Sequence, residues 1–305
     1  MAMTTYNGEK FILQQLQSLL NQKRRPDEVI IRDDCSKDST VNIIENFIKN
    51  NNLTSWKLII NNKNCGYIEN FRKAICDTQG DIIFLCDQDD IWHKDKIERM
   101  SSLMEQNEDI KALACSYNFI DAENREITGE EKFYTPKNNK EALSKIDYGK
   151  ILYYNIAQGC AAAYRRNICE KYINSASSSL PHDWALNIIS YETSGLYYLN
   201  EELFSYRLHT NNTTGIMNKD SSVKNRIPNL ENYALFMQEV STLNIKEECK
   251  KIYSEVSIFT RNRIKFLKNK KISTWLKGFK NKNALKILFL PYLKDLALVI
   301  TRKIA

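Results

Sequence analysis

The 305-residue sequence contains few prolines and glycines and no closely spaced cysteine pairs. Five prolines and nine glycines are too few for a collagen-like or linker-dominated chain. No two of the eight cysteines have CxxC spacing, which argues against a zinc site or a redox dithiol. Several cysteines lie in apolar runs, where a free thiol behaves as a small apolar side chain. We therefore expect a reducing, cytosolic compartment.

The sequence also lacks long apolar runs. The N-terminus shows no basic segment followed by an apolar one, so we expect no signal peptide. The longest uncharged run, residues 151–164, is too short to cross a bilayer. Charged residues and a proline interrupt the apolar stretches near the C-terminus. We therefore expect that this chain is not an integral membrane protein.

Charge is distributed unevenly along the chain. Residues 222–305 contain 18 Lys and Arg but only 6 Asp and Glu, a net charge of +12, whereas the whole chain carries +7. Residues 1–221 therefore sum to −5. This asymmetry predicts a mildly acidic body, residues 1–221, and a basic C-terminal region, residues 222–305, that faces nucleic acid, acidic lipid or a partner protein.

Apolar runs of strand length alternate with helical patterns in the first 120 residues. The runs are EVII (28–31), KLII (57–60), DIIFLC (81–86) and ALACSY (112–117), and between them apolar residues recur at helical spacing. This order predicts an α/β fold with a mainly parallel sheet flanked by helices. Only residues 1–4 remain for a first strand, which is therefore either unusually brief or trimmed. From residue 222 the pattern is helical.

Three carboxylates, Asp87, Asp89 and Asp90, directly follow the apolar run at residues 81–86. Such clusters are repulsive unless a cation is present, and hard oxygen ligands suit Mg²⁺ or Mn²⁺. The alternative is a solvated acidic turn that caps the next helix. A second pair, Asp33 and Asp34, follows residues 28–31 and could accept the N3–H of a uracil or thymine, or simply form a loop and a cap.

Two histidines lie next to residues that could take part in catalysis or ligand binding. His182 precedes Asp183, and His209 follows Arg207 in a polar loop that could hold a diphosphate. The alternatives are a packed or surface histidine and an aspartate that caps a helix. Each of these signals is weak when it is taken singly.

Taken together, the motifs resemble family 2 glycosyltransferases, in particular the rhamnosyltransferase-like branch. The resemblance covers about residues 1–215 and rests on ordered segments. These are TTYNGEKFILQQLQSLLNQ (4–22), VIIRDDCSKDST (29–40), NCGYIENFRKAI (64–75), GDIIFLCDQDDIW (80–92), NIAQGCAAAYRR (155–166), HDW (182–184) and YRLHTNNTTG (206–215).

The resemblance implies a GT-A (Rossmann-like) fold and assigns roles on the donor side of the site. It implies that Asp34 reads the pyrimidine and that Asp87 lies near the ribose or the sugar. Asp89 would ligate Mg²⁺ or Mn²⁺, His209 would complete the metal or diphosphate site, and Arg207 would neighbour the diphosphate. The other residues implied at the base are Thr4, Tyr6, which can stack on it, and Asp33.

On the acceptor side, the resemblance implies that Asp183 is the general base of an inverting transfer. We expect the N-terminus of the following helix to keep Asp183 ionised and His182 to cap that helix. The loop Gln158-Gly159-Cys160 and Trp184 would lie at the acceptor, where a glycine permits close approach of a sugar.

The expected function is inverting transfer of rhamnose or another hexose from a UDP- or dTDP-sugar to a growing cell-wall or other cell-surface glycan or a lipid-linked acceptor. One alternative is a sugar-nucleotide nucleotidyltransferase, which would need a Gly-rich basic loop where this chain reads Tyr6-Asn7-Gly8-Glu9. Another is a nucleic-acid-binding protein that uses the basic C-terminal region. No recognisable motif supports this second alternative, and the acidic body opposes it.

The basic C-terminal region favours a peripheral position at the inner face of the cell membrane. Its basic residues are interleaved at helical spacing with Ile264, Phe266, Leu267, Trp275, Leu276 and Phe279. This pattern predicts an interfacial amphipathic helix at residues 261–286 that binds anionic lipid. The alternative is a basic helical bundle. The basic residues are Arg261, Arg263, Lys265, Lys268, Lys270, Lys271, Lys277, Lys280, Lys282 and Lys286.

Overall fold

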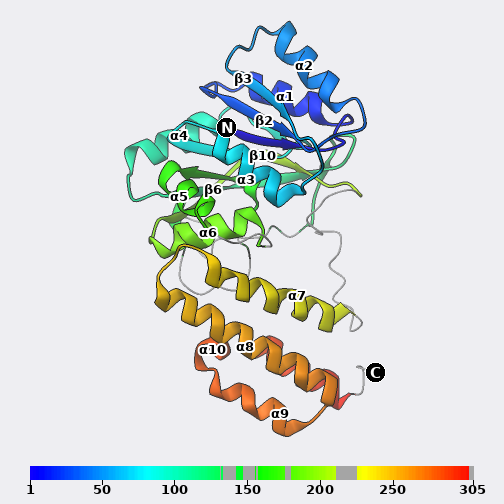
Figure 1. Cartoon of the computed structure of the whole chain (residues 1–305), viewed down its shortest axis with the longest axis vertical. Coiled ribbons are helices and arrows are strands. Elements are labelled where there is room, and N and C mark those ends of the chain that lie inside the picture. The colour runs from blue at the N-terminus through cyan, green and yellow to red at the C-terminus, as the bar shows by residue number, and fades with distance from the viewer. Residues whose placement is uncertain are drawn as a thin grey trace. The chain divides into compact units, whose positions relative to one another are not determined.

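The computed structural model describes residues 1–130, 132, 142–146, 155, 157–175, 180–210 and 225–301 (Figure 1). The chain divides into two compact units. The first comprises Met1–Asn174 and Pro181–Asn211, and the second comprises Ser175–Leu180 and Asn212–Ala305. The boundary that we predict between residues 221 and 222 lies outside the described residues, so the domain assignment stays a prediction.

The first unit is built on a sheet that contains ten strands among the described residues. Its order is β3-β2-β1-β4-β9-β6-β10-β5, with β7 paired to β6 and β8 to β10. The strands are β1 (Ala2–Thr5), β2 (Val29–Asp33), β3 (Trp56–Ile60), β4 (Ile82–Cys86), β5 (Ile91–Trp92), β6 (Ala112–Ile120), β7 (Glu126–Ile127), β8 (Leu143–Lys145), β9 (Ala162–Arg165) and β10 (Leu196–Arg207).

The parallel arrangement that the sequence predicts is confirmed for β3, β2, β1 and β4. β9 then runs antiparallel between β4 and β6, and β10 returns parallel to β6. β1 has only four residues, yet all four are buried because strands flank it on both sides. The brief first strand is therefore a central strand of the sheet.

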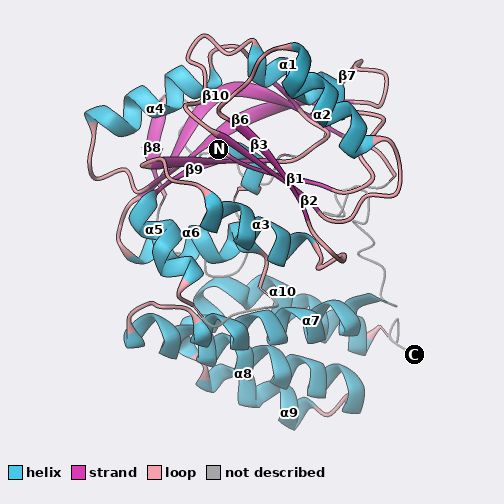
Figure 2. Ribbon diagram, turned by 45° about the horizontal axis from the view of Figure 1, so that its top comes forward, coloured by secondary structure: helices cyan, strands magenta, loops and turns pink. Residues whose placement is uncertain are grey.

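Helices cover both faces of this sheet (Figure 2). On α4, Ile97, Met100 and Met104 are buried, which confirms the predicted helical face. One face carries α1 (Ile12–Leu20), α2 (Thr40–Asn50) and α4 (Lys96–Gln106), and the other carries α3 (Tyr67–Asp77), α5 (Arg166–Ile173) and α6 (His182–Glu192).

The strand register brings the predicted donor residues to one edge of the sheet. Thr5, the last residue of β1, pairs with Asp33, the last residue of β2, and Met3 pairs with Cys86 at the end of β4. The acidic segments that follow β2 and β4 therefore emerge side by side at the carboxyl edge, where parallel α/β sheets bind their ligands.

All the elements of the second unit among its described residues are helices. Its core includes a buried carboxylate, Asp295, which accepts hydrogen bonds from Arg226 (2.8 Å) and Arg263 (2.7 Å). The rings of Trp275 and Tyr292 stack with centroids 5.1 Å apart. The elements are α7 (Arg226–Glu239), η3 (Val240–Thr242), α8 (Glu247–Asn269), α9 (Ile272–Leu276), η4 (Lys277–Lys280) and α10 (Lys282–Ile300).

The second unit corrects the prediction of a single lipid-facing helix at residues 261–286. These residues form the end of α8, α9, η4 and the start of α10. Four of the six apolar residues that we assigned to the lipid face are buried instead: Ile264, Phe266, Leu267 and Trp275. The remaining two, Leu276 and Phe279, are 56% and 42% exposed. No described helix combines the length and the hydropathy that crossing a membrane requires.

Candidate active site

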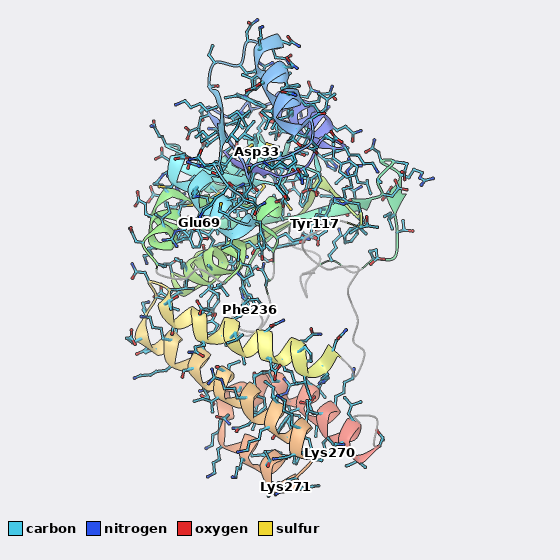
Figure 3. All side chains as sticks on the ribbon, turned by 45° about the vertical axis from the view of Figure 1, so that its right-hand side comes forward. Asp33, Glu69, Tyr117, Phe236, Lys270 and Lys271 are labelled. Carbon is cyan, nitrogen blue, oxygen red and sulfur yellow. The ribbon has the colours of Figure 1, made fainter. Side chains whose placement is uncertain are left out.

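The acidic pair after β2 is fixed by a dense set of hydrogen bonds. Thr5 Oγ1 donates to Asp33 Oδ2 (2.8 Å), and the backbone N–H of Ser36 donates to Asp33 Oδ1 (2.8 Å). Asp33 is fully buried at the carboxyl edge of the sheet (Figure 3). Asp33 therefore fixes the loop that carries Asp34, and so it helps to position the predicted base site.

The carboxylate of Asp34 is buried but surrounded by donors. The N–H groups of Cys65 (2.9 Å) and Gly66 (2.8 Å) and the amide of Asn61 (2.9 Å) donate to it. Burial alone would raise the pKa of Asp34, but these hydrogen bonds outweigh it and hold the pKa below its ordinary value. The structure therefore keeps Asp34 as an ionised acceptor. Its contact with a base stays a prediction.

The segment after β1 is held by Gln88, whose role we did not predict. Gln88 accepts from the N–H of Tyr6 (2.8 Å) and donates to its carbonyl (3.0 Å), as a neighbouring strand would. A Cβ at Gly8 would lie 2.3 Å from Gln88 Oε1, so a larger residue there would displace the Gln88 side chain. Tyr6 is 45% exposed, which leaves its ring accessible for stacking, whereas Thr4 is buried within β1.

Asp89 and His209 are separated by 120 positions in the sequence but meet in the fold. Asp89 Oδ2 and His209 Nε2 are 2.9 Å apart, and the His209 ring packs against Phe11 with centroids 4.9 Å apart. Two adjacent ligands of an octahedral Mg²⁺ at 2.0–2.1 Å lie about 3 Å apart. The two predicted ligands share a hydrogen bond at this distance, and they lie close enough together to hold one divalent cation in its place.

A second acidic group, Asp87, Asp90 and Cys160, suits such a cation less well. Their ligand atoms lie within 4.8 Å of one another. However, burial raises the pKa of the Cys160 thiol well above its ordinary value, and a protonated thiol is a poor partner for a hard cation. Burial, followed by the charge of Asp89, also raises the pKa of Asp87 to about 7.

Lys96 lies beneath this acidic group, and the sequence analysis missed it. It is fully buried, and its Nζ sits 3.6 Å from the ring centroid of Trp92 and 4.2 Å from that of Phe204. Burial lowers its pKa, while Asp90 and nearby cysteines oppose that shift. The signal was its i, i+4 spacing to the buried Met100, which places this lysine on the core face of α4. Lys96 thus provides a buried cation beside the acidic turn.

Arg207 is fully buried and bonded to the loops around the site rather than displayed on the surface. Its guanidinium donates to the carbonyls of Asp89 (2.7 Å) and Asp121 (3.0 Å) and to the side chain of Gln14 (2.9 Å). Its backbone N–H donates to Asp90 Oδ1 (3.1 Å). Arg207 therefore ties the acidic turn to the strand that leads to His209. Direct contact with a diphosphate stays a prediction.

Asp183 lies in the first turn of α6, as predicted, but its environment differs from our expectation. It is 7% exposed and accepts from the N–H of Trp184 (2.7 Å). Burial raises its pKa from 3.8 to about 6, although hydrogen bonds from Trp184, Asn155 and Gly159 oppose the shift. Burial outweighs the helix N-terminus and the hydrogen bonds, so the pKa of Asp183 lies above its ordinary value, although the carboxylate is still mostly ionised at pH 7.

The loop before β9 packs directly against Asp183. A Cβ at Gly159 would lie 2.9 Å from His182 Nε2 and 3.6 Å from Asp183 Cβ, so glycine permits this close approach. Gln158 is buried, and both of its amide atoms lack a partner among the described residues. Trp184 is buried as well, at 6% exposure. Contacts of these residues with an acceptor stay predictions.

The prediction that His182 caps α6 is wrong. Its ring stacks on Phe71 with centroids 4.0 Å apart, and burial lowers its pKa to about 3, which keeps the ring neutral. The cap position is Pro181, and no side-chain capping bond forms there. Neither ring nitrogen has a hydrogen-bond partner among the described residues, so His182 acts through packing beside Asp183.

Comparisons with known proteins show the family to which the chain belongs. Residues 1–173 match the model of glycosyl transferase family 2. The chain is 32% identical over 232 residues to the dTDP-rhamnosyl transferase RfbG of Shigella flexneri, covering 70% of this chain and 73% of that protein. This relative supports the resemblance to the rhamnosyltransferase-like branch.

Solved structures share the fold at low sequence identity. TarS from S. aureus, residues 1–349 in complex with UDP-GlcNAc, superposes with a TM-score of 0.60 at 16% identity, covering 96% of this chain and 80% of that one. The mannosyltransferase PcManGT from Pyrobaculum calidifontis, in complex with GDP-Man and Mn²⁺, gives 0.52 at 14% identity, covering 98% and 82%. The first unit thus has the predicted GT-A fold, and the chain belongs to glycosyl transferase family 2 and is a glycosyltransferase.

Proposed function

We propose that this glycosyltransferase moves a hexose, such as rhamnose, from a UDP- or dTDP-sugar to a hydroxyl of a cell-surface glycan or lipid-linked acceptor, with inversion. The observation that carries the proposal is the contrast between two buried carboxylates in the first unit. Asp34 is held ionised by donors, and Asp183 has a pKa of about 6. One suits recognition of a donor, and the other suits transfer of a proton.

The donor side favours a pyrimidine nucleotide. A fixed, ionised carboxylate such as Asp34 accepts the N3–H of uracil or thymine, and the exposed ring of Tyr6 can stack on the base. Two relatives point the same way, since RfbG is named as a dTDP-rhamnosyl transferase and TarS was solved with UDP-GlcNAc. Thr4 and Asp33 support this site through β1 and the loop after β2, and Asp87 would face the ribose or the sugar.

The reaction is a single displacement at the anomeric carbon. The acceptor oxygen forms a bond to that carbon while the bond from the carbon to the diphosphate oxygen breaks, and its electron pair leaves with the nucleoside diphosphate. Asp183 accepts the proton that the acceptor hydroxyl loses. A carboxylate with a pKa near 6 is ionised at neutral pH yet basic enough to take that proton as the bond forms.

Asp89 and His209 would hold a divalent cation, Mg²⁺ or Mn²⁺, on the leaving-group side. Their ligand atoms are 2.9 Å apart, which matches adjacent positions of an octahedron. Such an ion, when bound, supplies positive charge to the leaving diphosphate. Arg207 keeps Asp89 and the strand before His209 in register through its bond to the Asp89 carbonyl.

A screen of three donors tests the proposed function. We would incubate the full chain with dTDP-rhamnose, UDP-GlcNAc or GDP-mannose, with Mg²⁺ or Mn²⁺, and measure release of the nucleoside diphosphate. We expect release from a pyrimidine donor, its loss in excess chelator and its loss in Asp183→Asn. Turnover of the purine donor alone, or full activity in chelator, would overturn the assignment of the donor site.

We also propose that the second unit binds an anionic membrane surface, which would place the enzyme at the inner face of the cell membrane beside a lipid-linked acceptor. The candidate surface is a basic apolar patch on α9 and η4. Ile272, Leu276 and Phe279 are 54%, 56% and 42% exposed. Exposed lysines surround them, and Figure 3 shows two of these, Lys270 and Lys271, at the end of α8. The full set is Lys270, Lys271, Ile272, Leu276, Lys277, Phe279 and Lys280.

Positive charge beside exposed apolar side chains complements acidic lipid headgroups over acyl chains. We would compare sedimentation with phosphatidylcholine vesicles and with vesicles that contain phosphatidylglycerol. The double variant Leu276→Ser/Phe279→Ser should lose binding to the anionic vesicles. Leu235→Ser is the matched control, because Leu235 on α7 is 57% exposed outside the patch. Equal binding by the double variant and the control would refute the patch.

A further inference from the structure

A chain of hydrogen bonds runs through the interior of the first unit to Asn155, which acts on Asp183. Tyr164 on β9 donates its hydroxyl to Asn187 Oδ1 (2.9 Å), and Asn187 Nδ2 donates to Asn155 Oδ1 (2.9 Å). The Asn155 side chain in turn lowers the pKa of Asp183, as a hydrogen-bond donor beside that carboxylate does. Tyr164 and Asn187 are fully buried, whereas Asn155 is half-buried.

The direction of the chain follows from the chemistry of one backbone carbonyl. The carbonyl of Ala157 can only accept, and it lies 3.0 Å from Asn187 Nδ2. The NH₂ group of Asn187 must therefore face Ala157, and its oxygen must face the hydroxyl of Tyr164. The same NH₂ group donates to Asn155 Oδ1, which leaves only the NH₂ group of Asn155 to face Asp183. Every link consequently donates toward the carboxylate.

We propose that Tyr164, Asn187 and Asn155 form a one-way hydrogen-bond chain that orients the Asp183 carboxylate for proton acceptance. This proposal rests on the proposed role of Asp183 as the base. Asn187 lies one turn after Asp183 on α6, so the helix that carries the base also carries the residue that fixes its partner. Asn155 and Asn187 are positioning residues, because they act through Asp183 rather than on a substrate.

The hydrogen-bond chain should affect the pKa of Asp183. Amide donation to an ionised carboxylate stabilises the ionised form and opposes the effect of burial. Loss of the Asn155 amide should therefore make Asp183 harder to ionise, without a new charge in the site. Several titratable groups face Asp183 from the surrounding elements: Tyr67 on α3, Asp87 after β4, Tyr164 on β9, Tyr172 on α5 and His182 on α6.

Asp87 is the facing group that could blur a titration, since its own pKa lies near 7. The experiment must therefore observe Asp183 directly. Carboxyl ¹³C NMR of aspartate-labelled protein does so, with Asp183 assigned by the resonance that disappears in Asp183→Asn. This measurement needs no donor, acceptor or added metal.

The test compares the titration of Asp183 in the unmodified chain, Asn155→Leu and Tyr164→Phe. We expect Asn155→Leu to raise the Asp183 pKa by about one unit, the scale of a lost hydrogen bond to a charged group. Tyr164→Phe keeps the ring and removes only the far donor, so it should give a smaller shift of the same sign in a protein that folds.

Ser190→Ala is the matched control. Ser190 is fully buried on the same helix, but its hydroxyl donates to the Leu186 carbonyl of that helix, and this variant should leave the titration unchanged. The rate of transfer by Asn155→Leu should fall most at acidic pH and recover as the pH rises. If the Asp183 titration is unchanged in both Asn155→Leu and Tyr164→Phe, the proposed hydrogen-bond chain is wrong. Full transfer by Asp183→Asn would instead overturn the proposed function, which keeps the two failures distinct.

Discussion

Asp34 and Asp183 are both shielded from solvent but differ in depth, and the comparison shows how one residue type can suit two different roles. They are 3% and 7% exposed, and burial raises the pKa of both. At Asp34 the donors of Asn61, Cys65 and Gly66 outweigh burial, whereas at Asp183 burial dominates. The first carboxylate is a fixed acceptor, and the second can take up a proton near neutral pH. Both carboxylates accept several hydrogen bonds, so the deeper burial of Asp183 decides the difference.

The largest effect should come from the donor side, at the residue that pairs with His209. Asp89→Ala removes a proposed metal ligand without touching Asp183, and we expect transfer to fall by about 10³-fold or more. Titration of Mg²⁺ or Mn²⁺ by calorimetry should show weaker binding, while circular dichroism should match the unmodified protein. Normal activity with normal metal binding would remove Asp89 from the site.

The next largest effect should separate the two sides of the site. Asp183→Asn keeps the size of the side chain and its bond to the Trp184 N–H but cannot accept a proton. We expect transfer at saturating donor to fall by about 10²-fold or more, the scale of lost general-base catalysis. Calorimetric binding of the nucleoside diphosphate should be unchanged. Equal losses of binding and rate would mean that the two sides are not independent.

A smaller effect is expected at Asp34. Asp34→Ala should raise the KM for a pyrimidine donor by about tenfold or more, because one hydrogen bond to a charged acceptor is lost. The rate at saturating donor should change little. If pyrimidine and purine donors compete as they do with the unmodified enzyme, Asp34 does not read the base.

The sequence predicted much of this site because its strongest signals are local. The apolar runs that became β2, β3, β4 and β6 were recognised from their composition, and the carboxylates at the ends of β2 and β4 followed from position alone. The pairing of Asp89 with His209 was implied by the family resemblance and joins residues 120 positions apart.

The sequence could not predict properties that depend on which residues the fold places next to one another. In the sequence Gln88 looks like part of an acidic turn, and its hydrogen bond to the Tyr6 backbone is evident only once the fold places β1 beside it. The pKa of Asp183 depends on Asn155 and Gly159, which the fold brings to α6 from the loop before β9. The exposed or buried state of the C-terminal apolar residues also depends on how α8, α9 and α10 pack, which periodicity alone does not determine.

The smallest effect is on stability, and it should have opposite signs at the two aspartates. Because the folded pKa of Asp183 lies above 3.8, the fold binds this proton more tightly than the unfolded chain does, and stability is lost as the pH rises from about 4 to about 6. Asp183→Asn should therefore raise the free energy of unfolding at pH 7 by about 1–3 kcal/mol.

Asp34 should respond in the other direction. Its folded pKa is depressed, so its contribution to stability is present above the unfolded pKa and is lost as the pH falls through the folded pKa. Asp34→Asn should lower the free energy of unfolding at pH 7. Urea titrations of both variants provide the measurement, and shifts of the same sign would contradict the contrast drawn between the two carboxylates.

The pH dependence of transfer tests the role of Asp183 most directly. A base with a pKa of about 6 must be ionised to act, so the rate at saturating donor should be level above pH 7 and fall about tenfold per unit below pH 6. Asp87 has a pKa near the same range, so the residual activity of Asp183→Asn must be followed in parallel. We predict that this acidic limb disappears in Asp183→Asn. An acidic limb that persists unchanged in the variant, or a rate that stays level from pH 5 to 8 in the unmodified enzyme, would contradict the assignment of Asp183 as the base.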